Sequence, residues 1–103
     1  MNTPTGHCFE DSFSAIARGQ AEGLPDLSKF DSVSLVHGTT NVGPHAWIRL
    51  TSGKFCFVYE TQEKRIISES DHRDAIRASA ERTYTIAEAV KLAFTTGHTG
   101  PWQ

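Results

Sequence analysis

Two alternating segments on either side of Ser52-Gly53 constrain the fold of this 103-residue chain more than any other feature. The segments 45–51 and 54–60 carry apolar side chains at every second position, which is typical of strands with one buried face. Ser52-Gly53 is a connection of the kind that closes a two-residue β-hairpin. We therefore expect an antiparallel hairpin over residues 45–60.

The length of this turn predicts the register of the hairpin. With two residues in the turn, apolar side chains pair on one face as Leu50–Phe55, Ile48–Phe57 and Ala46–Tyr59. The other face pairs Arg49–Cys56, Trp47–Val58 and His45–Glu60. The predicted register thus sets an imidazole directly opposite a carboxylate, at a distance where cross-strand side chains interact.

A helix is expected before the hairpin, from about Cys8 to Ala21. Its apolar residues recur at helical spacing and are Phe9, Phe13, Ile16 and Ala17. Acidic residues occupy its first turn, and Gly23 with Pro25 ends the segment. Cys8 is then at the helix N-terminus, where the helix dipole and free backbone N–H groups favour a thiolate.

The remaining segments predict further elements of an α+β domain. Residues 33–37 are expected to form a strand that ends at Gly38, followed by a loop to Pro44, and Ile66-Ile67 to extend the sheet. Residues 71–81 are a short helix candidate. Thr85 and Glu88 form a capping box for a last helix, which Gly97 ends. Its apolar stripe comprises Ile86, Ala89, Val90, Ala93 and Phe94.

Length and charge limit the function classes. A chain of 11.4 kDa builds one hydrophobic core, so residues 1–103 form a single domain. The net charge of −2 offers no basic field for nucleic acid. Without a signal peptide or a long apolar run, we expect a cytoplasmic protein with no membrane contact, in which Cys8 and Cys56 are free thiols.

Cys8, His45 and Glu60 together form a candidate catalytic triad. An imidazole can hold a thiolate as an ion pair and deliver a proton to a leaving group, while a carboxylate orients the ring. The backbone N–H of Cys8 is one candidate donor to an oxyanion. Further candidates for the oxyanion site and the cleft are Asn2, His7, Trp47 and Gln62. No metal-ligand spacing is present, and we expect no cofactor.

Each triad residue also has a structural interpretation when it is taken alone. Cys8 would be a small buried hydrophobe, His45 a residue that caps the end of a strand, and Glu60 an exposed acid at a sheet edge. The order of helix-start cysteine, strand histidine and acid on the next strand is that of a papain-like core.

Four segments of the sequence carry a resemblance to a known family. The segments Gly6-His7-Cys8-Phe9-Glu10-Asp11-Ser12-Phe13, Leu35-Val36-His37-Gly38-Thr39, Pro44-His45-Ala46-Trp47-Ile48-Arg49 and Phe57-Val58-Tyr59-Glu60 resemble bacterial and phage transglutaminase-like cysteine hydrolases. The resemblance covers most of residues 6–62, and the ending 84–102 is similar to that of small proteins of this kind. The pattern of that family is Cys, then His-Ala-Trp, then Tyr-Asp. This chain has Glu60 in place of the aspartate and Pro44 in place of a glycine.

What the resemblance implies is a papain-like or transglutaminase-like fold with Cys8 as nucleophile, His45 as base and Glu60 as the third member. The expected reaction is hydrolysis of a peptide or isopeptide amide, or acyl transfer to an amine, through a thioester. Peptides or proteins are the expected substrates. Two alternatives stay open: an inactive module of the same fold that binds a protein, and an ADP-ribosyltransferase-like dinucleotide binder. The second is suggested by Leu35-Val36-His37-Gly38-Thr39 with a later Tyr and Glu.

Overall fold

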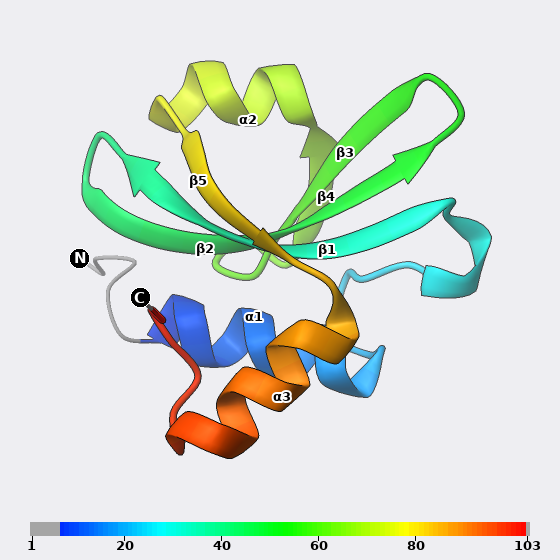
Figure 1. The fold of residues 1–103 in the computed structure, drawn as a ribbon. Coiled ribbons are helices and arrows are strands. Elements are labelled where there is room, and N and C mark those ends of the chain that lie inside the picture. Colours follow the sequence, from blue (N-terminus) through cyan, green and yellow to red (C-terminus); the bar gives the residue numbers. More distant parts are fainter. Residues whose placement is uncertain (1–6, 103) are drawn as a thin grey trace.

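The computed structural model describes residues 7–102 and has an α+β architecture (Figure 1). In chain order the elements are α1 (His7–Arg18), a short 3-10 helix (Leu27–Lys29), β1 (Ser32–Thr40), β2 (Gly43–Ser52), β3 (Phe55–Glu60), β4 (Arg65–Ser68), α2 (Glu69–Ile76), β5 (Ser79–Tyr84) and α3 (Ile86–Thr96). Within these residues no helix has the length and apolar character needed to cross a bilayer.

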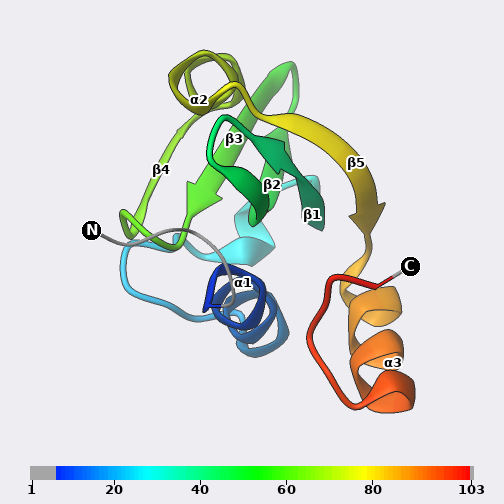
Figure 2. The same cartoon turned by 90° about the vertical axis from the view of Figure 1, so that its left-hand side faces the viewer.

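The five strands form one antiparallel sheet in the order β4-β3-β2-β1-β5. Helices α1 and α3 cover one face of the sheet and α2 covers the other (Figures 1 and 2). The main core lies between the sheet and α1 and α3, and its buried residues are Ala15, Ile16, Leu35, Ile48, Leu50, Tyr59, Ala89 and Trp102. A smaller cluster of Val36, Trp47 and Val58 lies on the α2 face.

Helix α1 begins where the sequence predicts but ends earlier. It runs from His7 to Arg18, so Cys8 lies in its first turn as expected. The predicted end near Ala21 is wrong, because Gly19 adopts a φ of 69° and its N–H bonds to the Ala15 carbonyl. A residue without Cβ reaches this left-handed conformation at no steric cost and ends the helix there.

The hairpin is present, but its predicted register is wrong by two residues. Ile48 faces Tyr59 and Leu50 faces Phe57, because the turn is formed by Gly53-Lys54 and Ser52 still pairs with Phe55. The φ of 58° at Gly53 suits a tight hairpin turn. Since side chains alternate along a strand, a shift of two residues keeps every side chain on its predicted face.

The predicted loop from Gly38 to Pro44 is shorter than expected. Strand β1 continues to Thr40 and β2 begins at Gly43, so only two residues connect them. The Thr40 hydroxyl accepts a hydrogen bond from the Val42 N–H and donates one to the Gly43 carbonyl, which closes the turn. Local side-chain bonds of this kind stabilise turns.

The segment after β4 is a helix followed by a strand, and the predicted helix over 71–81 is wrong in its second half. Helix α2 ends at Ile76, because Arg77 adopts a left-handed φ of 54°. Residues Ser79–Tyr84 then form β5, a strand that the sequence did not predict and that pairs with β1. This edge strand is mostly exposed, so it carries no apolar alternation that would reveal it.

Helix α3 has the predicted capping box. The Thr85 hydroxyl accepts from the Glu88 N–H, and the Glu88 carboxylate accepts from the Thr85 N–H. The expected apolar stripe does not pack as one surface. Its buried or partly buried members are Ala89 and Ala93, whereas Ile86, Val90 and Phe94 are exposed.

Candidate active site

The first turn of α1 packs against the start of β2. Cys8 and Phe9 form a buried cluster with Ala46, and Cys8 is 0% exposed. One turn further along α1, the Ser12 hydroxyl donates a hydrogen bond of 3.2 Å to the Ala46 carbonyl. This contact fixes the cysteine-bearing helix to the strand that also carries His45.

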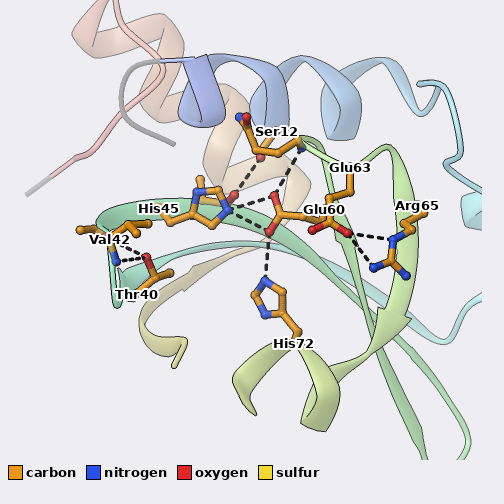
Figure 3. A network of polar contacts seen from close by, with 11 residues as sticks. Ser12, Thr40, Val42, His45, Glu60, Glu63, Arg65 and His72 are labelled. Carbon is orange, nitrogen blue, oxygen red and sulfur yellow. Dashed lines mark hydrogen bonds and ion pairs between the residues drawn. The ribbon is translucent and has the colours of Figure 1, made fainter. Parts of the chain in front are cut away.

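His45 and Glu60 meet at the end of β3. Strand β2 extends beyond the last pair of the β2–β3 ladder, Ile48 with Tyr59, so His45 has no β3 residue directly opposite. Continuing the ladder by one position brings Glu60 beside Trp47, so its side chain lies on the same face of the sheet as that of His45. The side chains of Glu60 and His45 therefore meet diagonally. The Nε2 of His45 lies 2.9 Å from Oε1 and 2.8 Å from Oε2 of Glu60 (Figure 3).

A second histidine, which the sequence interpretation missed, completes the network. His72 of α2 places its Nε2 3.0 Å from Oε2 of Glu60. Figure 3 shows Glu60 between His45 and His72, with Ser12 and α1 on one side and α2 on the other. His72 is 3% exposed, and its ring centroid is 4.9 Å from that of Trp47. A buried histidine in a short polar helix has no local periodicity that would identify its partner.

Hydrogen bonds and charges between the side chains of this network offset the free-energy cost of burying its ionised groups. Burial is the largest influence on His45 and lowers its pKa, but the side chains of Cys8 and Glu60 outweigh it and raise the pKa to about 9. Burial likewise raises the pKa of Glu60, while the hydrogen bonds and charges of His45 and His72 bring it down to about 2. At neutral pH the pair is therefore an imidazolium and a carboxylate.

The ionised Glu60 determines which ring nitrogens carry protons. A carboxylate only accepts hydrogen bonds, so both Nε2 atoms that face it must be N–H donors. Because Nε2 of His45 is engaged in this way, its Nδ1 is the nitrogen available to exchange a proton with Cys8. That Nδ1 is buried, and no described residue makes a hydrogen bond of normal geometry with it.

The other predicted site residues lie in different surroundings. The side chain of His7 is 86% exposed and approaches Glu10 at 3.9 Å, facing solvent. Trp47, a predicted cleft residue, is only 3% exposed, because His72 of α2 packs against it. Gln62 donates its backbone N–H to Oε1 of Glu60 at 3.4 Å. Asn2 lies outside the described residues.

A cavity of about 180 Å³ opens onto the network from the α2 side. His45, Glu60 and His72 line it together with apolar residues that include Val42, Ile67 and Ile76. Cys8 does not line this cavity, since it lies on the α1 side of the network.

His37 lies apart from this network. Its ring packs against Phe9, Tyr84 and Trp102 at centroid distances of 4.7, 5.0 and 5.1 Å, on the α1 face of the sheet. Burial lowers the pKa of His37 to about 4, and no described residue hydrogen-bonds to either ring nitrogen. His37 and Glu60 therefore do not share one site, as the ADP-ribosyltransferase alternative requires.

The described residues contain no group of three or more His, Cys, Asp or Glu side chains arranged to hold a metal ion. No protein-family model, curated protein or solved structure matches the chain.

Proposed function

We propose that the chain is a cysteine hydrolase or acyltransferase on a papain-like, transglutaminase-like core, with Cys8 as nucleophile, His45 as base and Glu60 as orienting acid. The observation that carries the proposal is the buried His45–Glu60 ion pair beside a helix-start cysteine. Such a pair costs free energy to bury, so a protein gains little stability from it alone. Perturbed titratable groups that are grouped in this way are typical of functional sites.

The chemistry follows from the positions of the protons. In the resting ion pair the proton of the Cys8 thiol already lies on Nδ1 of His45, and the thiolate attacks the carbonyl carbon of an amide. The resulting oxyanion accepts hydrogen bonds from backbone N–H groups at the start of α1. When the C–N bond breaks, His45 returns the proton to the leaving amine. Water or a second amine then attacks the thioester and releases the acyl group from Cys8.

Peptides or proteins are the proposed substrates. Hydrolysis and acyl transfer share the thioester step and differ only in the nucleophile that resolves it. The acidic net charge of −2 argues against a polyanionic substrate.

One observation favours a second candidate, an inactive module of the same core that binds a protein partner. Cys8 is completely buried, which is also the normal environment of a structural cysteine. In that case the thiol would have ordinary reactivity, and Cys8→Ser would leave binding unchanged.

The pH dependence of Cys8 alkylation separates the two candidates. We would use the Cys56→Ser background, so that iodoacetamide labels Cys8 alone, and follow labelling by intact-mass spectrometry. Burial slows labelling by the same factor at every pH, so the rate is normalised to its alkaline plateau. The midpoint of the profile then reports the thiolate.

A thiolate–imidazolium pair predicts a midpoint below about pH 6, and a loss of at least about tenfold in the rate at that pH in His45→Ala. His98→Ala, which removes an exposed histidine, is the control and should leave the profile unchanged. A midpoint near about 8.5 that His45→Ala does not move would rule out the catalytic proposal and favour the binding module.

A further inference from the structure

Glu60 receives N–H groups from two imidazoles that come from different elements of the fold. His45 comes from β2 and is next to Cys8 of α1, whereas His72 comes from α2. Both imidazoles approach the same oxygen, Oε2, at 2.8 and 3.0 Å. The carboxylate is thus held from two directions.

A single bond to His45 would leave the carboxylate of Glu60 free to rotate about its side-chain torsions. The second bond removes this freedom and keeps both oxygens within 2.9 Å of His45 Nε2. An orienting acid acts through such geometry, because it stabilises the imidazolium only when it lies in line with the N–H.

His72 is itself held firmly. The Ser68 hydroxyl caps α2 by accepting a bond from Asp71, the residue before His72. The ring packs against Trp47, and Trp47 fits because residue 38 is a glycine. A Cβ on Gly38 would lie 2.8 Å from Cη2 of Trp47 and 2.2 Å from the Ser79 carbonyl oxygen, so any side chain there would displace this packing.

We propose that His72 is a positioning residue, which holds the Glu60 carboxylate against His45 and so keeps His45 protonated beside Cys8. This role rests on the proposed function, because it serves the thiol chemistry of Cys8. The effect of His72 on His45 can nevertheless be measured independently of that chemistry. His72 touches no substrate in this role and acts through Glu60.

Other charges near His72 belong to the same environment. Arg49, Glu69 and Arg73 line a cavity with it on one side. Glu63 and Arg65 line the cavity that it shares with His45 and Glu60 on the other. Arg49 pairs with Glu69 at 2.6 Å and Arg65 with Glu63 at 2.7 Å, so their charges largely cancel in pairs.

The test measures the pKa of His45 by NMR titration of the imidazole in variants of His72. His72→Phe and His72→Met remove the N–H, whereas His72→Gln keeps an uncharged N–H that can reach Glu60. We expect the pKa of His45 to fall by about one unit in the two apolar variants and to change by less than about 0.3 unit in His72→Gln. Asp74→Asn alters an exposed residue of the same helix and serves as the control.

A purely structural role predicts a different pattern. The pKa of His45 would then be unchanged or higher in His72→Phe and His72→Met, and that result overturns the proposal. If neither apolar variant folds, an NMR measurement on the wild-type protein provides the test. Imidazole ¹⁵N shifts must show a proton on Nε2 of His72 at neutral pH, and an unprotonated Nε2 excludes the donated bond.

The two proposals fail in distinguishable ways. Ordinary reactivity of wild-type Cys8 overturns the proposed function whatever the His72 variants show. A reactive Cys8 with an unmoved pKa of His45 in the apolar variants overturns only the role of His72. When both hold, the alkylation midpoint of Cys8 moves to higher pH in His72→Phe and stays in place in His72→Gln.

Discussion

Both carboxylate oxygens of Glu60 face Nε2 of His45, at 2.9 and 2.8 Å, and the two side chains are only 6% and 3% exposed. A buried ion pair is favourable only while both members are charged, because either charge left alone would sit in a medium of low dielectric constant. Changes to one member must therefore affect the protonation of the other.

Glu60→Gln tests this dependence directly. Without the carboxylate only Cys8 opposes the effect of burial, and we expect the pKa of His45 to fall from about 9 toward its ordinary value of 6.5. The free energy of unfolding should fall by about 2 kcal/mol near neutral pH, since the charged pair is lost while the amide still accepts a hydrogen bond. NMR titration of His45 and urea denaturation measure the two effects.

Glu63→Gln is the matched control for this variant. Glu63 is three positions further along the chain and also pairs with a cation, Arg65, at 2.7 Å, but both side chains are more than half exposed. Exposed pairs contribute little, so we expect a change below about 0.5 kcal/mol and no change at His45. Equal losses in the two variants would contradict a special role for the buried pair.

The sequence predicts the parts of this site that depend on local signals. The start of α1 at Cys8 and the capping box of Thr85 and Glu88 follow from residue preferences at helix ends. The faces of β2 and β3 follow from alternation. Because a shift of two residues preserves these faces, His45 and Glu60 meet although they are not the opposite pair that the turn predicts.

What the sequence does not predict depends on contacts between distant elements. The turn is formed by Gly53-Lys54 and not by the predicted Ser52-Gly53, because Ser52 still pairs with Phe55. No local sequence signal requires this pairing. Strand β5 is a polar edge strand and is recognisable only through its partner β1. His72 is in a short helix whose burial comes from the sheet beneath it, so its contact with Glu60 has no counterpart in the periodicity of the chain.

The dependence of stability on pH provides a second prediction. The pKa of Glu60 is about 2, below its ordinary 4.5, so its contribution is complete above pH 4.5 and is lost as the pH falls toward 2. The pKa of His45 is about 9, above its ordinary 6.5, so its contribution is complete below pH 6.5 and is lost as the pH rises through 9. Both shifts report one interaction and are not summed.

The difference in unfolding free energy between wild type and Glu60→Gln should therefore be largest between pH 4.5 and 6.5 and decline on both sides. Other titrating groups, His37 among them, contribute equally to the two proteins and cancel. Urea titrations at a series of pH values supply the difference. A difference that is constant with pH would show that Glu60 and His45 are not charged together in the folded protein.

Ser12 provides a third prediction, because it connects α1 to β2. Its hydroxyl is 0% exposed and donates to the Ala46 carbonyl. Ser12→Ala removes this donor, and we expect the free energy of unfolding to fall by about 1 kcal/mol. Ser14→Ala on the same helix is the control, since Ser14 is only partly buried. Loss of stability confined to Ser12→Ala, seen by urea denaturation, would support the connection; equal effects would contradict it.

His37 provides the last prediction. The ring is 5% exposed among aromatic side chains, and burial lowers its pKa to about 4, so it is neutral in the folded protein at pH 7. Its pKa lies below the ordinary 6.5, so its contribution to stability is complete above pH 6.5 and falls as the pH drops toward 4. The folded state thus resists protonation of His37, and acid favours unfolding.

His37→Phe should remove the loss of stability that the buried imidazole of His37 causes. A phenyl ring keeps the edge contacts with Phe9, Tyr84 and Trp102, and an adjoining cavity of about 360 Å³ leaves room for its larger size. We expect a gain of about 1 kcal/mol at neutral pH from removing polar atoms that lack partners, and about 2 kcal/mol more near pH 5. Urea denaturation at the two pH values measures the gain. His7→Phe, at an exposed position, should leave the pH slope unchanged. A His37→Phe protein less stable than wild type at pH 5 would mean that the imidazole has a polar partner in the folded protein.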